Sequence, residues 1–376
     1  MRRAILIVAA AALALPVLAL PAQAGADRLD RALDRIVDAR GGPPGLSVLI
    51  HRGGRDELRR AGVADVRTKR RPTARDHMRI ASMAKAYSGA VTLSLASGGA
   101  LRVDETIGER LPGVLPLANP VTLGQALQHT GGLPDYIRTE AFVKRLTGDL
   151  GGYISPAEIV GFVRDHPLEF APGSQYRYSD TDNIVAALMA EAATGKSYEQ
   201  LLAEVVYGPL GLSHTSLPRT PALPRPYLHG YEVEPGKKPE DVSTLLNPAG
   251  AWASGGIVST PREVGRFFRA YVAGRFVSPA IRAAQGQFRP GSSSPLGPGR
   301  NDAGLGIFRY QTRCGTVFGH TGSFPGYRLF AASTEDGRRS VVFSVNAQIV
   351  PGQGSRKVSN AIRRAQTLAV CRALSG

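Results

Sequence analysis

The sequence of 376 residues is poor in the residues that build metal and cofactor sites, with only two cysteines and seven histidines. Two cysteines cannot supply the four thiolates of a structural zinc or iron–sulfur centre, and neither has neighbouring residues that would complete a mixed site. Motifs for nucleotide or flavin binding are also absent from the sequence. The chain is therefore expected to use neither a metal nor a cofactor.

Long hydrophobic runs are absent except at the N-terminus. Arg2 and Arg3 precede an apolar stretch over residues 4–20, and Ala22-Gln23-Ala24 then has the small-residue pattern of a signal-peptidase site. We expect residues 1–24 to be a signal peptide cleaved after Ala24, and the mature protein to be secreted and extracellular, without stable membrane insertion. An uncleaved membrane anchor is the alternative, which Pro16 within the stretch disfavours.

Lysine is also scarce, because 39 of the 46 basic residues are arginine, and with 30 acidic residues the net charge is +16. One interpretation is attraction to anionic wall polymers or membrane surfaces, with the densest basic patch between residues 52 and 79. The other is biased codon usage, which the abundance of Arg, Ala, Gly and Pro favours. Nothing in the sequence is typical of a nucleic-acid-binding fold, so no nucleic-acid partner is expected.

Cys314 and Cys371 are an even number of cysteines in a chain that is expected to be exported. This favours one disulfide, which would tie a strand region to the C-terminal helix. Two free buried thiols are the alternative.

The first chemical motif is Ser82-Met83-Ala84-Lys85, which opens a stretch rich in Ala and Leu that ends at Gly98-Gly99. This composition predicts a buried helix, on which residues three positions apart share a face, so the Lys85 amine would lie near the Ser82 hydroxyl. Free backbone N–H groups at a helix N-terminus suit a developing oxyanion. Ser82 would then be a nucleophile beside its base; the alternative is an N-cap serine followed by a solvated lysine.

Two further motifs, Tyr178-Ser179-Asp180 and His320-Thr321-Gly322, follow in the chain. They would supply a second proton carrier and a strand edge for a peptide-like substrate. His320 lies in a predicted antiparallel meander, where Gly322 permits close approach by another backbone. His129 also begins a His-Thr-Gly sequence, but it follows a short helical run and precedes a loop, so we interpret it as structural.

The pattern of apolar residues predicts an α+β fold, an antiparallel sheet flanked by helices and built from both ends of the chain. We expect residues 25–76 and 243–376 to form the sheet domain and residues 77–242 to be a mainly helical insert. The site would lie in the cleft between them, so that residues 25–376 form a single catalytic unit.

These motifs resemble those of the penicillin-recognising serine hydrolases, the family of serine β-lactamases, DD-peptidases, related esterases and D-amino-acid peptidases. The resemblance covers nearly the whole mature chain and includes four further runs in the same order, 129–136, 170–173, 208–212 and 251–256. The pattern is most similar to exported actinobacterial D-alanyl-D-alanine carboxypeptidases, including the two cysteine positions. The β-lactamase/transpeptidase-like fold that this implies agrees with the one expected above.

The resemblance implies a role for each motif. It implies catalytic roles for Ser82, Lys85, Tyr178 and His320, and an oxyanion hole made by the backbone N–H groups of Ser82 and Ser323. It implies substrate binding by Asp180, Thr321, Gly322 and Ser323. Trp252, in a glycine-rich loop, is expected to line the cleft, with ordinary core packing as the alternative.

Two positions depart from the family pattern. Asp180 stands where many relatives have Asn, and because an ionised Asp only accepts hydrogen bonds, it would pair with Lys85 and raise its pKa. In the carboxypeptidases that the chain resembles, an Arg on the strand before His-Thr-Gly binds the substrate terminus. The equivalent position here is Phe308, and the adjacent Arg309 reaches the cleft to bind substrate only if a bulge or register shift turns it inward.

We therefore expect a secreted serine hydrolase that acts through an acyl-enzyme and is D-alanyl-D-alanine carboxypeptidase-like, with a small peptide or peptidoglycan stem peptide as substrate. A β-lactamase or esterase on the same site is the first alternative, with β-lactams as ligands, although no dedicated Glu for activating water is apparent. A penicillin-binding or peptidoglycan-sensing module without turnover is the alternative of another class, and Asp180 is its only hint. The sequence does not predict an oligomeric state.

Overall fold

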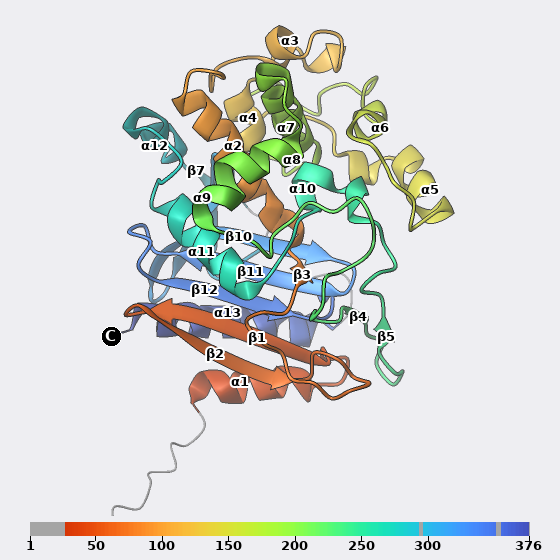
Figure 1. Ribbon diagram of the computed structural model, residues 1–376, viewed down its shortest axis with the longest axis vertical. Coiled ribbons are helices and arrows are strands. Elements are labelled where there is room, and N and C mark those ends of the chain that lie inside the picture. The colour runs from red at the N-terminus through yellow and green to blue at the C-terminus, as the bar shows by residue number, and fades with distance from the viewer. Residues whose placement is uncertain (1–26, 293–295, 351–354, 376) are drawn as a thin grey trace, which may run out of the picture.

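The computed structural model describes residues 27–292, 296–350 and 355–375 (Figure 1). The predicted signal peptide, residues 1–24, lies outside the described residues. Within the described ranges, no helix combines the length and the apolar character that crossing a bilayer requires.

An eight-stranded sheet with the order β2-β1-β12-β11-β10-β9-β8-β7 forms the centre of the molecule, and every neighbouring pair is antiparallel. The first two strands come from the N-terminal part and the other six from the C-terminal part: β1 (Gly45–Arg52), β2 (Arg55–Gly62), β7 (Arg289–Ser292), β8 (Arg300–Gly304), β9 (Ile307–Thr312), β10 (Gly315–Phe324), β11 (Tyr327–Ser333) and β12 (Ser340–Val345). The predicted fold class is confirmed.

Both faces of the sheet are covered by helices, which explains why β11 and β12 are buried along their whole length. Successive side chains of a strand point to opposite faces. Phe330 and Phe343 therefore pack on one face against α1 (Arg28–Val37) and α13 (Arg356–Leu374). Leu329 and Val342 pack on the other face, which α2 (Ala84–Ser97) and α11 (Pro261–Val272) cover.

The remaining helices gather above this second face (Figure 1). They are mostly short: α3 (Ile107–Arg110), α4 (Leu123–Leu127), α5 (Glu140–Gly148), α6 (Pro156–Gly161), α7 (Thr181–Thr194), α8 (Tyr198–Leu201), α9 (Gly208–Leu210), α10 (Trp252–Gly255) and α12 (Pro279–Gln285). The longest of them, α7, is rich in Ala and packs directly against α2. Small side chains allow the two backbones to approach closely.

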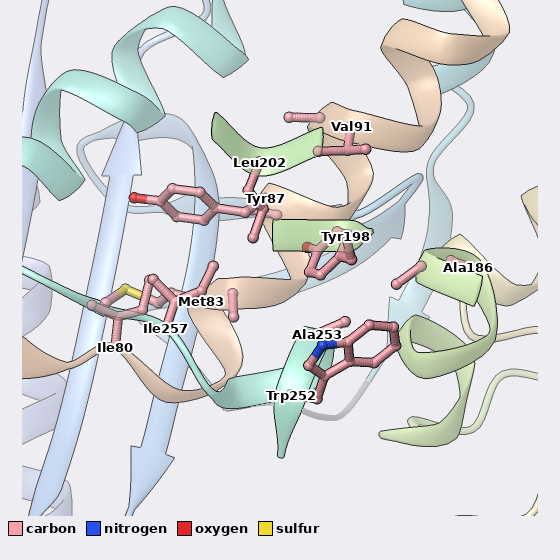
Figure 2. Close-up of a cluster of buried hydrophobic side chains, with 14 of the residues drawn as sticks. Ile80, Met83, Tyr87, Val91, Ala186, Tyr198, Leu202, Trp252, Ala253 and Ile257 are labelled. Carbon is pink, nitrogen blue, oxygen red and sulfur yellow. The ribbon is translucent and has the colours of Figure 1, made fainter. Parts of the chain in front are cut away.

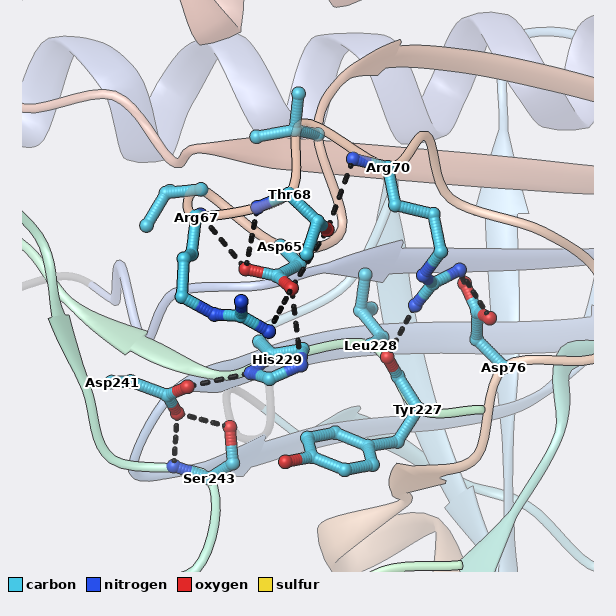
Figure 3. A network of polar contacts seen from close by, with 12 residues as sticks. Asp65, Arg67, Thr68, Arg70, Asp76, Tyr227, Leu228, His229, Asp241 and Ser243 are labelled. Atoms are coloured by element: carbon cyan, nitrogen blue, oxygen red, sulfur yellow. Dashed lines mark hydrogen bonds and ion pairs between the residues drawn. The ribbon is translucent and has the colours of Figure 1, made fainter. Parts of the chain in front are cut away.

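Four minor strands form two further pairs: β3 (Met78–Arg79) pairs with β6 (Val258–Ser259), and β4 (Tyr231–Glu232) pairs with β5 (Glu240–Asp241). Polar contacts fix the segments around them (Figure 3). The Arg70 guanidinium donates to Asp76 at 2.7 Å and to the Tyr227 carbonyl at 2.5 Å, and His229 Nδ1 lies 2.5 Å from an Asp241 oxygen. The Arg70 contacts hold Tyr227 against the segment that leads into β3, and the His229–Asp241 contact lies within residues 225–243.

Cys314, in the turn between β9 and β10, is joined by a disulfide to Cys371 on α13, 57 positions along the chain. This is the pairing expected from the sequence. In the chain-entropy description, a loop of this length stabilises the fold by about 4 kcal/mol. The bond fastens α13 to the end of the sheet that carries β9 and β10.

Candidate active site

Ser82 lies in a single 3-10 turn, Ala81–Met83, immediately before α2. Ala81 has a φ of +52°, in the left-handed region that costs a residue with a Cβ about 1 kcal/mol or more. The turn is held in place because the Ile80 N–H donates to the Ile257 carbonyl at 3.0 Å. Ser82 makes no side-chain cap for α2 and stays partly exposed, so its hydroxyl is available for chemistry.

Gly322 of β10 lies against this turn. A Cβ at Gly322 would stand 2.5 Å from the Ile80 carbonyl oxygen and 3.2 Å from the Ala81 Cβ. Only a residue without a side chain allows this approach, which confirms the expectation that Gly322 admits another backbone. The Ser82 turn and the strand edge are thereby brought together.

The Lys85 amine is buried and donates to three acceptors. These are Ser82 Oγ at 3.3 Å, Asp180 Oδ1 at 2.5 Å and the Ser254 carbonyl at 2.8 Å. An ammonium group has three N–H donors, so the three contacts satisfy it completely. If the amine loses one proton, it can accept the Ser82 hydroxyl proton while it still donates to the other two partners.

Asp180 precedes α7 at the N-cap position, but its carboxylate makes no cap hydrogen bond and turns to Lys85 instead. The sequence-based expectation that Asp180 pairs with Lys85 is therefore confirmed. The backbone N–H of Asp180 donates to Asp135 Oδ1 at 3.1 Å. Burial and the negative charge of Asp180 raise the pKa of Asp135 to about 6, so a second carboxyl group beside the lysine titrates near neutral pH.

The Tyr178 ring lies over the Lys85 amine, with 5.0 Å between the ring centroid and Nζ. Its hydroxyl is buried and has no hydrogen-bond partner among the residues that the structure describes. Burial first, and then the charge of Asp180, raise the pKa of Tyr178 well above 10, and the nearby Ser82 hydroxyl acts in the opposite direction. Tyr178 is therefore a neutral phenol beside Ser82 with a proton to donate.

His320 is fully buried on β10, and its Nδ1 lies 2.6 Å from the Thr321 carbonyl oxygen. A carbonyl only accepts, so Nδ1 carries the proton and Nε2 is left as an acceptor. Nε2 has no partner in the described part of the chain. Burial and the nearby Lys85 charge lower the pKa of His320 to about 3, so the imidazole is neutral at physiological pH.

One edge of β10 is open beside these groups. Within the described ranges, β9 pairs with β10 only as far as Gly319, and residues 320–324 have no strand neighbour on that side. Phe324 of β10 and Tyr327 of β11 are paired across a two-residue turn, so the N–H groups of Phe324 and of every second residue before it point toward β11. The alternate residues of β10, including Thr321 and Ser323, therefore direct their N–H groups to the open edge. The Ser323 hydroxyl is exposed and accepts a hydrogen bond from Gln348 at 3.0 Å.

His129 lies behind Tyr178 and does not contact Ser82 or Lys85. Its Nδ1 is 2.7 Å from Asp182 Oδ2, and its ring centroid is 4.4 Å from that of Tyr178. Burial, Lys85 and His320 lower the pKa of His129, while burial raises that of Asp182. The prediction of a structural role agrees with this placement, although that role is to support a wall of the site.

Trp252 does not line the cleft, which corrects the expectation of a substrate-binding role. It is buried, packs edge-on against Tyr198 at 5.3 Å between ring centroids, and belongs to the apolar cluster around Met83 and Tyr87 (Figure 2). The physical reason is that α10 begins at this residue and directs the indole into the core. The adjacent Ser254 is the residue of α10 that touches the site, through its carbonyl oxygen.

Arg309 is also not brought to this cluster, so its predicted role in binding substrate is corrected. The β8–β9 and β9–β10 registers run through it without a bulge, opposite Asp302 and Phe318. Its guanidinium donates twice to Asp302, at 3.0 and 2.8 Å, and lies over the Phe288 ring. Phe308 points to the opposite face and packs against His320 instead, with 5.1 Å between ring centroids.

A family model described as Beta-lactamase matches residues 29–363. The chain belongs to the Beta-lactamase family. This family of serine hydrolases includes penicillin-binding proteins and D-amino acid amidases, which agrees with the resemblance identified from the motifs.

Among curated relatives, the chain is 23% identical over 304 residues to penicillin-binding protein 4* of Bacillus subtilis, covering 76% of this chain and 64% of that protein. It is 26% identical over 210 residues to protein flp of Staphylococcus aureus, covering 54% of this chain and 41% of that protein. The chain thus spans less than two thirds of the length of these Beta-lactamase relatives.

Among solved structures, a D-stereospecific amidohydrolase from a Streptomyces species superposes with a TM-score of 0.78 and 26% identity, covering 90% of this chain and 97% of that one. The D-amino acid amidase from Ochrobactrum anthropi complexed with D-phenylalanine also has a TM-score of 0.78, at 24% identity, covering 92% and 99%. The second likeness shows that the fold is shared.

Two contributors to the site had no role assigned from the sequence: the Asp135 carboxylate and the Ser254 carbonyl. Both lie in runs that carry the family resemblance, 129–136 and 251–256. Their position in these runs could have identified both residues as candidates for the site. It could not have shown that Ser254 contributes its backbone carbonyl, because every residue has one.

We expect Gly322→Ala to slow acylation of Ser82 by about 10²-fold or more, because the new Cβ must displace the Ile80–Ser82 turn by a substantial fraction of an ångström. The rate of labelling by a fluorophosphonate probe measures this. Gly148→Ala is the matched control, since a Cβ there meets nothing within 4 Å. Equal labelling rates for the two variants would contradict the proposed role of this contact.

The depressed pKa of His320 predicts a pH dependence of stability. A histidine held neutral by the fold contributes its full stability above pH 6.5 and loses it progressively as the pH falls toward about 3, because the unfolded chain binds the proton first. Urea unfolding at pH 7.5 and pH 4.5 should therefore show a smaller loss, by on the order of a few kcal/mol, in His320→Gln than in the parent protein.

Asp135, with a pKa raised to about 6, acts in the opposite direction in both proteins, so the comparison between variant and parent isolates His320. Exposed His166 provides the control, and His166→Gln should keep the parent pH dependence. The assignment fails if His320→Gln and His166→Gln lose the same free energy of unfolding between the two pH values.

Proposed function

We propose that this chain hydrolyses amide bonds through an acyl-enzyme on Ser82, and that its substrates are short peptides or amino-acid amides with a D residue on the acyl side of the cleaved bond. The observation that carries the hydrolase proposal is the contact of Lys85 Nζ with Ser82 Oγ at 3.3 Å, beside the open edge of β10. The D preference is supported by the likeness to the D-stereospecific amidohydrolase from Streptomyces.

Acylation begins when Ser82 Oγ attacks the substrate carbonyl and its proton passes to the neutral Lys85 amine. The amine becomes neutral by releasing a proton to Asp180, whose oxygen is 2.5 Å away. The backbone N–H groups of Ser82 and Ser323 stabilise the oxyanion. Tyr178 donates its phenolic proton to the leaving nitrogen, and the proton held by Lys85 restores the phenol.

Neutral His320 completes this scheme as an acceptor. Its free Nε2 and the free Tyr178 hydroxyl are a complementary acceptor and donor, with 6.3 Å between the two ring centroids. A water molecule between them would keep the phenol oriented. Hydrolysis of the acyl-enzyme follows the same proton route in reverse, with water as the nucleophile.

The position of Arg309 bears on which end of the substrate is recognised. Since its guanidinium is held by Asp302, no arginine of β9 is available to pair with a terminal carboxylate in the cleft. This favours substrates that end in an amide or an ester over substrates that end in a free carboxylate. A D-alanyl-D-alanine carboxypeptidase acting on peptidoglycan stem peptides is the second candidate, which the hydroxyl groups of Thr321 and Ser323 at the open edge favour. Export after cleavage at Ala24 would bring the enzyme to such peptides.

A matched pair of substrates tests the proposal: an N-acylated peptide ending in D-Ala-D-Ala and the same peptide with a terminal carboxamide. We expect the purified protein to hydrolyse the carboxamide, and D-phenylalanine amide, with a kcat/KM about tenfold or more above that for the free acid, the cost of an unpaired carboxylate. The L isomers should react far more slowly. Preference for the free acid would instead establish the carboxypeptidase candidate.

Ser82→Ala should lower turnover of every accepted substrate by about 10³-fold or more. A fluorescent penicillin separates the remaining alternatives by mass spectrometry. Rapid release of an adduct would indicate a β-lactamase, and a durable adduct without hydrolysis of any peptide or amide would indicate a sensor. Full turnover by Ser82→Ala would refute the acyl-enzyme.

A second prediction concerns Asp180. In Asp180→Asn the amide oxygen can still accept a hydrogen bond from Lys85, but an amide cannot take the proton that the proposed scheme passes from the lysine. We therefore expect kcat/KM for every accepted substrate to fall by about tenfold or more. Exposed Asp104→Asn, which removes one carboxylate far from the site, should leave kcat/KM unchanged. An unchanged kcat/KM in Asp180→Asn would show that Asp180 does not take this proton.

A further inference from the structure

A basic groove lies on the face of the sheet opposite Ser82, between α1 and α13. Its volume is about 500 Å³. Five arginines line it together with a small apolar floor: Arg28, Arg31, Arg35, Arg313 and Arg364, with Ala32, Ala361, Thr367 and Leu368. In Figure 1, α1 lies below β2 and α13 lies behind β12 and β1, both away from the helices gathered above the sheet.

The sequence spacing puts these arginines on one surface. Arg28, Arg31 and Arg35 are at positions i, i+3 and i+7 of α1, next to the stripe of Leu29, Leu33 and Ile36 that is buried against the sheet. Arg364 projects from the facing side of α13. Arg313 comes from the β9–β10 turn, where the disulfide of the adjacent Cys314 fastens it to α13.

Four of the five groove arginines lack a counter-charge among the described residues. Arg28, Arg35, Arg313 and Arg364 are exposed, and none of the four forms an ion pair or a side-chain hydrogen bond with another described residue. The sequence of α13 contains five basic residues and no acidic residue. Of these five, Arg372 is paired with Asp27 and Glu57, while Arg364 in the groove has no counter-charge among the described residues.

The basic patch expected between residues 52 and 79 behaves differently. Its arginines are largely paired within the protein: Arg52 with Glu57, Arg59 with Asp30 and Arg70 with Asp76. Arg79 is buried and donates to carbonyl groups. Several arginines of that patch therefore have an internal partner, whereas four arginines of the α1–α13 groove have none among the described residues.

We propose that this groove binds a soluble anion that carries two or more phosphate groups. Arginine presents a planar set of donors that matches phosphate oxygens, and four unpaired guanidinium groups around one concave surface suit a multiply charged ligand. A bilayer surface is disfavoured as the source of phosphate, because the large exposed apolar side chains of the described residues lie elsewhere: Leu117, Ile137, Val143, Tyr153, Leu245 and Leu296. This site is independent of the proposed hydrolase activity.

Titration calorimetry of the full protein with inorganic tripolyphosphate tests this site, with citrate as a carboxylate anion of comparable charge. We expect tripolyphosphate to bind at least tenfold more tightly than citrate and to raise the melting temperature by mass action. A triple variant that replaces three groove arginines by Gln should weaken tripolyphosphate binding about tenfold or more: Arg28, Arg35 and Arg364. These side chains are exposed, so the variant should fold and melt no lower than the parent.

The control is a triple variant with the same loss of charge at exposed, unpaired arginines elsewhere: Arg55, Arg164 and Arg275. It should bind tripolyphosphate as the parent does.

Equal weakening of tripolyphosphate binding in both triple variants would show attraction by net charge alone and overturn the site. Citrate binding as tightly as tripolyphosphate would overturn the phosphate assignment. Sedimentation with phosphatidylglycerol vesicles, but not phosphatidylcholine vesicles, by a protein that ignores tripolyphosphate would make a membrane the partner and overturn the proposal.

Discussion

The close approach of the Ala81–Met83 turn to β10 at Gly322 is the constraint on which the site depends. It requires a residue without a Cβ on the strand and a left-handed residue, Ala81, in the turn. The interaction between β3 and β6 and the bond from Ile80 to Ile257 hold that geometry from the other side. Ser82, which we propose as the nucleophile, and the open edge of a distant strand are therefore held together with little freedom, and the strain at Ala81 is supported by the surrounding core.

Electrostatics around Lys85 follow from this enclosure. The buried Lys85 amine lies near two aspartates, two histidines and a tyrosine, and burial shifts the pKa of Asp135, His129, His320 and Tyr178 toward the neutral form of each. His320 stays neutral because burial and Lys85 both oppose a second positive charge. Tyr178 stays protonated because burial and Asp180 oppose a second negative charge.

The sequence predicted the parts of this structure that local pattern determines. The Ser82–Lys85 spacing on a helix, the meander that carries His320, the antiparallel sheet and the Asp180–Lys85 pair all follow from periodicity or from donor and acceptor chemistry. Trp252 and Arg309 could not be placed in this way. The direction of Trp252 depends on where α10 begins, and the partner of Arg309 depends on the cross-strand residue Asp302, which only the register of β8 and β9 reveals.

Building one sheet from both ends of the chain also governs how the protein is made. β1 pairs with β12, and the Gly45 N–H donates to the side chain of Asn346, 301 positions away. Contacts of such long range slow folding, because the chain must close a very large loop before they form. The central strands cannot pair until nearly the entire polypeptide has left the ribosome. A nascent chain therefore remains without its complete central sheet for most of its synthesis, and a product that stops before β12 leaves β1 paired only with β2.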